Sequence, residues 1–396
     1  MTSSKPGRAL FRPATSAVAL TALIALAALT ACSSGATPGD EEIDRSVSVS
    51  MLPPISQPGL EVADPEDAQP VVAARFDQDS AGREASLEQS ASGDWDEVAT
   101  AEVDEDGVAE FVVEGGADDE APYRVVAAAS GDLPAAQSPE VSGGSWGEPV
   151  FADAFDGEEL GDEWYHRAPD YNPDGLRRCS KGSPNAVTVG GGTATLRVVD
   201  DPARDDSCEA LKDNGKSLGT FDYRLNGHIA TDEYFLYGVS AARIKFQREP
   251  GQHGSFWMQS DVGLEIDIVE YFGDDGQGRL ASFVYYPTPE GFVKEGDWIE
   301  DAADFLADQD DDWWQSYHVF ALERSKEYYT IRIDGKEAWR TDQGVQGHPE
   351  FIVLSLLSSD YELPNLPEGG LPQAMEVDWV RHWDTPTGEA TTTLGR

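Results

Sequence analysis

Residues 265–270 carry the pattern that most restricts how this chain can fold. Three acidic residues, Glu265, Asp267 and Glu270, are interleaved there with three apolar residues that favour β-structure. Alternation with a period of two is typical of a β-strand, in which side chains two positions apart project from the same face. Glu265 and Asp267 therefore share one face of the predicted strand. A β-bulge that adds one residue after Asp267 would return Glu270 to that face.

Three carboxylates in a line on one face of a sheet favour acid–base chemistry on a sugar. Glycosidases that retain the anomeric configuration hold two carboxyl groups about 5–5.5 Å apart. Aromatic residues flank the acidic run, with Trp257 before it and Tyr271 after it. Such rings stack on the apolar faces of sugars. A solvated strand edge or a calcium-binding strand is the alternative reading of the six residues alone.

Six segments of the chain resemble, in the right order, the sequence of glycoside hydrolase family 16, the group of laminarinases, lichenases, agarases and carrageenases. The segments are 151–156, 237–245, 256–258, 265–270, 317–323 with 333–336, and 376–381. The resemblance covers about residues 148–385. It implies an all-β fold, a concanavalin A-like jelly-roll sandwich of two curved antiparallel sheets with the substrate cleft on the concave face.

The same resemblance assigns roles to the three acids. Glu265 would be the nucleophile, Glu270 the general acid/base, and Asp267 the residue between them, which could share a proton with Glu265. The nucleophile needs a low effective pKa and the acid a raised one, and neighbouring carboxylates penalise each other's ionisation. The reaction would keep the anomeric configuration and requires no cofactor.

Four residues are candidates for substrate binding: Trp257, His228, Tyr285 and Trp298. His228 and Tyr285 stand where many glucan-cleaving members of the family have Arg and His, so the reaction type is unaffected but the polysaccharide stays open. Trp257 would either pack beneath the acids or form a sugar platform. Of Tyr285 and Tyr286, one should face the cleft and the other the core. Trp298 would line an outer subsite or cap its loop.

Asp378 matches a position of the family that often binds a structural calcium on the convex side of the sandwich. Calcium takes several oxygen ligands, whereas an acid at a strand end is also common without any metal. The resemblance therefore raises the calcium at Asp378 as one of two readings.

The chain is strongly acidic, with 28 Lys and Arg against 74 Asp and Glu among 396 residues and a net charge of −46. This charge disfavours nucleic acid and anionic membrane surfaces as partners. A polyanionic polysaccharide is disfavoured as well, unless basic residues gather locally. The expected partner is a polysaccharide substrate, bound by a monomer.

Residues 1–32 are predicted to be a lipoprotein signal peptide. Lys5, Arg8 and Arg12 precede an apolar stretch that is too short for a comfortable transmembrane helix. Small residues lead to Cys32, as in a bacterial lipobox, so Cys32 is the predicted lipidation site. The protein would then be exported and held on the outer face of the cell membrane by its lipid alone. Ordinary secretion with a chance cysteine is the alternative.

The rest of the chain divides by composition. Residues 33–45 are predicted to be a flexible tether, and residues 46–142 a small β-sandwich, immunoglobulin- or fibronectin-like. That sandwich would act as a spacer or, with Trp95 as its platform, as a carbohydrate-binding module. A linker, 143–147, precedes the catalytic domain, 148–386, and a disordered tail, 387–396. Cys179 and Cys208 are predicted to form a disulfide.

The leading functional hypothesis is an endo-acting retaining glycosidase on a β-linked polysaccharide, with a β-1,3- or mixed-linkage glucan favoured over a galactan. A transglycosylase would share the covalent intermediate, so the sequence does not separate transfer from hydrolysis. A carbohydrate-binding lipoprotein without turnover is the hypothesis of another class. Such a protein has no reason to keep three aligned acids.

Overall fold

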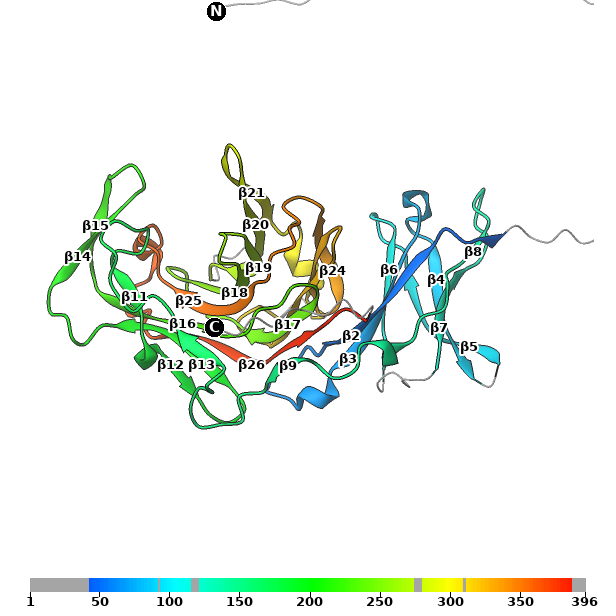
Figure 1. Cartoon of the computed structure of the whole chain (residues 1–396), viewed down its shortest axis with the longest axis horizontal. Coiled ribbons are helices and arrows are strands. Elements are labelled where there is room, and N and C mark those ends of the chain that lie inside the picture. The colour runs from blue at the N-terminus through cyan, green and yellow to red at the C-terminus, as the bar shows by residue number, and fades with distance from the viewer. Residues whose placement is uncertain (1–42, 92, 115–120, 274–279, 309–310, 387–396) are drawn as a thin grey trace, which may run out of the picture. The chain divides into compact units, whose positions relative to one another are not determined.

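The computed structural model describes residues 43–91, 93–114, 121–273, 280–308 and 311–386. The predicted leader with Cys32, nearly all of the predicted tether and the tail 387–396 lie outside these residues. In the described ranges the chain forms β-strands and short 3₁₀ turns, so the predicted all-β class is confirmed (Figure 1). None of the helices in these ranges has the length and apolarity to span a membrane.

Two small sheets form the N-terminal block, with strand orders β1-β8-β7-β4-β5 and β2-β3-β6. Their strands are β1 (Ile43–Asp44), β2 (Ser48–Ser56), β3 (Gln69–Arg75), β4 (Glu84–Ala91), β5 (Asp94–Glu102), β6 (Val108–Val112), β7 (Tyr123–Ala127) and β8 (Ala135–Gln137). Val72 and Phe111 of one sheet share a core with Leu87 and Val125 of the other. The immunoglobulin- or fibronectin-like assignment stays a prediction. The guanidinium of Arg124 covers one face of Trp95, 4.1 Å from the ring centroid.

A single large sheet dominates the rest of the chain, in the order β21-β20-β19-β18-β25-β16-β13-β26-β17-β22-β23-β24, with β9 to β12 paired beside this path. Its strands before the acidic run are β9 (Phe151–Asp153), β10 (Trp164–His166), β11 (Ser180–Gly182), β12 (Val187–Val189), β13 (Ala194–Asp200), β16 (Arg224–Thr231), β17 (Gly238–Lys245) and β18 (His253–Gln259). The remaining strands are β19 (Glu265–Tyr271), β20 (Leu280–Thr288), β21 (Gly291–Trp298), β22 (His318–Arg324), β23 (Tyr329–Ile333), β24 (Lys336–Thr341), β25 (Phe351–Leu357) and β26 (Gln373–Trp383).

Short elements connect these strands. A separate hairpin consists of β14 (Ser207–Leu211) and β15 (Ser217–Asp222). The 3₁₀ turns are η1 (Pro65–Asp67), η2 (Gln78–Ser80), η3 (Gly143–Ser145), η4 (Pro184–Ala186), η5 (Ala302–Phe305) and η6 (Leu363–Asn365). The predicted linker contains η3, and Trp146 next to it donates a hydrogen bond from Nε1 to the carbonyl of Met51.

The large sheet curls so that its two halves face each other across one apolar core (Figure 1). Ile266 of β19 and Leu354 of β25 come from one half, whereas Ile244 of β17, Leu322 of β22 and Val377 of β26 come from the other. All five side chains are fully buried. Alternating strands that bury one face against a second layer give a curved jelly-roll sandwich, so the predicted fold is confirmed.

The outer side of β17 and β26 carries a second apolar cluster, which contacts the N-terminal block. Leu52 and Ile55 of β2 pack there with Val239 and Trp379. Nearby, Arg332 of β23 forms an ion pair with Glu110 of β6. These contacts involve β17, β23 and β26, whereas the cavity described below is lined by residues of β16, β18, β19, β20, β21 and β25.

Candidate active site

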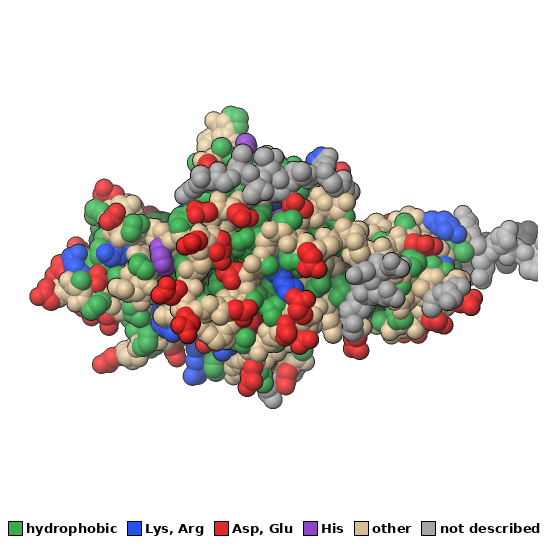
Figure 2. All heavy atoms as spheres, turned by 60° about the horizontal axis from the view of Figure 1, so that its bottom comes forward, with side chains coloured by type: hydrophobic (Ala, Val, Ile, Leu, Met, Phe, Trp, Pro, Cys, Tyr) green, Lys and Arg blue, Asp and Glu red, His purple; other side chains and the backbone are tan. Residues whose placement is uncertain are grey.

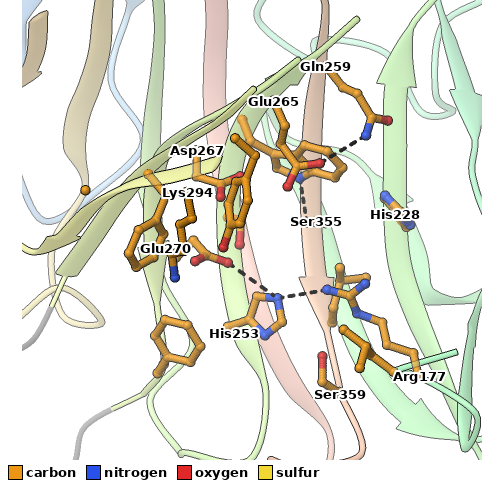
Figure 3. A pocket seen from close by; sticks show the side chains of 18 of the residues that line it. Arg177, His228, His253, Gln259, Glu265, Asp267, Glu270, Lys294, Ser355 and Ser359 are labelled. Atoms are coloured by element: carbon orange, nitrogen blue, oxygen red, sulfur yellow. Dashed lines mark hydrogen bonds and ion pairs between the residues drawn. The ribbon is translucent and has the colours of Figure 1, made fainter. Parts of the chain in front are cut away.

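The three predicted catalytic acids lie on β19, and the predicted bulge is present. Asp267 pairs with Trp257 and Val269 with Phe256, so Ile268 is the additional residue in the strand. The register to β20 shifts over the same stretch, between Asp267 and Glu270. The additional residue shifts the alternation of side chains by one position, so Glu270 projects from the same face as Glu265 and Asp267. Glu265, Asp267 and Glu270 consequently all line one cavity of about 900 Å³ (Figure 3).

The neighbouring strand β18 supplies the floor of this cavity through the same two-residue period. The side chains at alternate positions Phe256 and Met258 are buried in the apolar core. The residues of β18 that line the cavity are His253, Ser255, Trp257 and Gln259. One apolar face and one polar face of a single strand thus separate the core from the site.

A chain of contacts orients Glu265. Gln259 donates a hydrogen bond from Nε2 to Oε2 of Glu265, at 3.0 Å. Arg167 in turn donates from Nη2 to Oε1 of Gln259, at 2.6 Å, and its guanidinium lies 5.0 Å from the centroid of the Trp257 ring. Trp257 donates from Nε1 to Oγ of Ser355, at 3.1 Å. Trp257 is therefore part of the cavity wall, and a hydrogen bond from its indole N–H to Ser355 of β25 fixes the ring.

His253 stands beside Glu270. Its Nδ1 lies 2.8 Å from Oε2 of Glu362, and its Nε2 lies 3.8 Å from Oε1 of Glu270 and 3.5 Å from Nη2 of Arg177 (Figure 3). His253 and Glu362 are 2% and 3% exposed. Because Glu362 fixes the ring, His253 presents one nitrogen to Glu270 in a fixed orientation.

Burial dominates the protonation of the three acids. Burial raises the pKa of Glu265 and Glu270, and it raises the pKa of Asp267 well above its usual range, with the neighbouring carboxylates adding to the effect. The positive charge of Arg177 opposes the rise at all three. Asp267 is only 6% exposed, and its pKa is the most strongly raised of the three.

The structure brings the predicted substrate-binding residues to the same cavity. Trp257, His228, Tyr285 and Trp298 all line it. Tyr286 instead packs against the apolar core, as expected for the neighbour of a cleft-facing residue. The indole of Trp298 is 43% exposed and lies edge-on to Phe272, with ring centroids 5.3 Å apart.

Sequence reasoning missed several cavity residues, most of them basic or polar. They are Arg167, Arg177, His253, Gln259 and Lys294. The sequence did contain a signal for His253 and Gln259. Both are an even number of positions from Trp257, so on a regular strand they project from the same face as Trp257. Arg167 and Arg177 lie outside regular strands near the acids, and nothing in their local sequence points toward them.

The predicted disulfide is present and lies next to the cleft. Cys179 and Cys208 are bonded, with Cα atoms 5.5 Å apart. The bond joins the loop before β11 to the hairpin β14–β15. Asp360 holds the same loop, since it forms an ion pair with Arg178 at 2.9 Å and accepts a hydrogen bond from the backbone N–H of Cys179. The disulfide and the contacts of Asp360 thus hold the loop in place at Arg178 and Cys179, directly after Arg177.

The surroundings of Asp378 do not fit the calcium that the family resemblance raised. Its carboxylate forms an ion pair with Arg243, and both side chains are almost completely buried. The same guanidinium also donates to the carbonyl of Glu61, at 3.1 Å. Arg243 therefore brings the positive charge that a metal would bring, and a cation beside it would be repelled. Among the described residues, no group of three or more His, Cys, Asp or Glu side chains could hold a metal ion.

Charge is distributed unevenly between the surface and the cleft. Acidic side chains are spread over the face of the molecule seen in Figure 2, where Lys and Arg are few. The cavity, in contrast, is lined by Arg167, Arg177 and Lys294 together with two histidines. The local environment of the acids is thus far less negative than the chain as a whole.

Comparison with known proteins agrees with this geometry. The family described as Glycosyl hydrolases family 16 matches residues 202–380, which include β16 to β25 and all three acids. The part of the chain that carries the site is thus similar to glycoside hydrolases of family 16, as the sequence motifs predict.

Individual relatives are distant. The Crh-like protein CRH12 of Candida albicans is 28% identical over 148 residues, which are 36% of this chain and 28% of that protein. A beta-glucanase of Acetivibrio thermocellus is 24% identical over 183 residues, which are 43% of this chain and 50% of that protein. The chain thus spans half or less of the length of these relatives. Among solved structures, LamAcat from Zobellia galactanivorans gives a TM-score of 0.49 at 16% identity, covering 61% of this chain and 100% of that one.

Proposed function

We propose that this protein is a retaining endo-glycosidase that hydrolyses a β-linked polysaccharide, with a β-1,3- or mixed-linkage glucan as its substrate. The observation that carries this proposal is the bulge in β19, which puts Glu265, Asp267 and Glu270 on one wall of the cavity. A merely structural strand has no need of a bulge that exposes a third acid to a cleft. The beta-glucanase relative supports a β-glucan as the substrate class.

The chemistry follows from the environment of each acid. Glu265 attacks the anomeric carbon and forms a covalent glycosyl–enzyme while Glu270 donates a proton to the departing oxygen. Burial raises the pKa of Glu270, which suits a group that must be protonated at the start of the reaction. Glu270 then removes a proton from water, which attacks the same carbon and releases Glu265. Two inversions restore the original configuration.

The length of the cavity supports action within a chain. The lining residues come from six adjacent strands, β21, β20, β19, β18, β25 and β16. With strands about 4.8 Å apart, this row spans roughly 24 Å across the sheet. A cleft that crosses the strands over such a distance accommodates several sugar residues on both sides of the acids.

The test is to digest a β-1,3-glucan and a mixed-linkage glucan and to follow polymer length, reducing ends and product anomers by NMR. We expect the polymer length to fall early while few reducing ends appear, and the β-anomer to form first. Release of monosaccharides alone would contradict endo action. First appearance of the α-anomer would contradict retention.

We further propose that the enzyme works outside the cytoplasm, anchored through lipid on Cys32. The disulfide between Cys179 and Cys208 supports an oxidising compartment. Expression of the full chain and of Cys32→Ser in a lipoprotein-processing bacterium tests this, since detergent extraction should be needed for the first protein only. Equal release of both proteins without detergent would contradict the anchor.

A further inference from the structure

One end of the cavity is built from hydrogen-bond donors and positive charge. Its residues come from β16, β18 and the loop before β11. The side chains of Arg177, His228 and Ser255 line it, and Arg177 and His228 lie together beyond His253 as seen from Glu270 (Figure 3). No acid from β16, β18, β25 or that loop is among the residues that line the cavity.

Polar atoms at this end have no partner in the part of the chain that the structure describes. They are Nε2 of His228, Oγ of Ser255 and Nε of Arg177. His228 and Ser255 are 8% and 2% exposed. Buried polar groups are normally hydrogen-bonded, so three such atoms around one cavity indicate the place of a ligand.

Arg177 carries its charge unpaired although the chain has 74 acidic residues. Its nearest polar contact is Nε2 of His253 at 3.5 Å, and within the described ranges it forms no ion pair with a carboxylate. The next residue differs, since Arg178 is held by Asp360 at 2.9 Å. The Arg178 ion pair and the disulfide at Cys179 fix the loop on one side. They leave the guanidinium of Arg177 at the cavity.

Positive charges gather around His228 at this end of the cavity, with Arg177 and Arg167 among the lining residues. Burial, followed by the charges of Arg167, Arg177 and His253, lowers the pKa of His228 well below its usual range. A neutral sugar hydroxyl can accept hydrogen bonds from these donors but leaves the guanidinium charge without a counter-charge. A planar or tetrahedral oxyanion accepts several hydrogen bonds at once and pairs with a guanidinium in a fixed geometry.

We infer that Arg177, His228 and Ser255 form a subsite for an anionic substituent of the polysaccharide, a carboxylate or a sulfate ester on a sugar residue near the scissile bond. The inference rests on the proposed glycosidase function and adds that a β-linked polymer with such a substituent is cleaved more efficiently than the unsubstituted, neutral glucan. In the row that crosses the sheet from Glu270 through Ser255 and Ser355 to His228, Ser255 is one strand from the acid and His228 is three strands from it. With strands about 4.8 Å apart, the subsite extends from about 5 Å to about 14 Å from Glu270 across the sheet.

The test uses matched polymers that differ in charge only: a neutral β-glucan, the same glucan oxidised to carboxylate at its primary hydroxyls, and the same glucan sulfated. In the wild-type enzyme we expect kcat/KM on one charged form to exceed that on the neutral form. In Arg177→Gln this ratio of charged to neutral should fall about tenfold or more, as for loss of a hydrogen bond to a charged group. Arg248→Gln, which removes a guanidinium that stacks on Trp314 and does not line the cavity, should keep the ratio.

A binding measurement separates this inference from the proposed function. Glu265→Gln, run in gels that contain each polymer, should be retarded most by one charged form, and added salt should weaken that retardation. Suppose that both the wild-type enzyme and Arg177→Gln hydrolyse the polymers with the same ratio of kcat/KM on the charged form to kcat/KM on the neutral form. That result would overturn the anionic subsite and leave the glycosidase function in place. Absence of hydrolysis together with salt-sensitive binding of a charged polymer would overturn the glycosidase and keep the subsite. Whichever charged form is favoured distinguishes carboxylate from sulfate.

Discussion

His253 holds its Nε2 3.8 Å from Oε1 of Glu270, while Glu362 binds its other ring nitrogen at 2.8 Å. The imidazole thus bridges a buried carboxylate and the proposed general acid. Arg177, Lys294, Glu265 and Asp267 also face this region of the cavity. The orientation of Glu270 and its affinity for a proton depend on this arrangement.

His253→Gln should shift the alkaline limb of the pH profile of kcat/KM to higher pH. Burial raises the pKa of Glu270, and the charge of His253 opposes that rise. Removing the imidazole therefore raises the pKa further, and the acid keeps its proton to higher pH. His348→Gln, at an exposed position, is the matched control and should leave the profile in place. A shift of the limb to lower pH would rule out this role for His253.

Glu270→Gln should lower kcat on a polymeric substrate about 10²- to 10⁴-fold, as expected for loss of a general acid. With an aryl glycoside whose leaving group needs no proton, the first step should be much less affected, so that a glycosyl–enzyme accumulates. Burst kinetics with that substrate measure the effect. Equal losses on both substrates would show that Glu270 does not protonate the leaving oxygen.

Trp298→Ala should raise KM and leave kcat nearly unchanged. The indole lies at the edge of the cavity and is 43% exposed, with Phe272 packed edge-on beside it. Loss of one aromatic stacking contact of about 1 kcal/mol corresponds to roughly a fivefold rise in KM. Steady-state kinetics on the preferred glucan provide the values. A fall in kcat at constant KM would instead indicate a role near the reacting atoms.

Asp378→Asn should lower the free energy of unfolding by about 3–5 kcal/mol, because it leaves the buried guanidinium of Arg243 without its partner. The pair is 1% and 2% exposed at its two side chains. Chemical denaturation with and without a chelator gives the measurement, and the chelator should have no effect on the wild-type protein. Asp206→Asn, which breaks an exposed pair with Arg204, serves as the control and should change stability little. A large loss of stability with the chelator would restore the calcium at Asp378.

Part of the fold was predictable because strands such as β13, with its burial alternating along Ala194–Asp200, keep a period of two. The spacing of the acids at 265–270 predicts the bulge that β19 shows. Trp313 was less readable, since it lies in an acidic segment that resembles a solvated loop, yet its indole is completely buried.

The basic wall of the site could not be predicted from the sequence. The position of Arg177 depends on the ion pair of Arg178 with Asp360, a residue more than 180 positions further along the chain. The sequence motif singled out Asp378, but it did not predict that Arg243 would be its ion-pair partner. The pairing of Arg243 with Asp378 depends on the register between β17 and β26 and on the carbonyl of Glu61 in a distant segment. Long-range contacts of this kind leave no local periodic signal.

The most direct test of the proposed function compares sugar release from β-glucans by the wild-type protein, Glu265→Gln and Glu159→Gln. Glu159 is an exposed carboxylate outside the cavity and controls for loss of an acid as such. We predict that Glu159→Gln releases sugar at the wild-type rate and that Glu265→Gln loses about three orders of magnitude or more. Sugar release by Glu265→Gln at a rate close to that of the wild type would contradict the assignment of Glu265 as the nucleophile and with it the proposed mechanism.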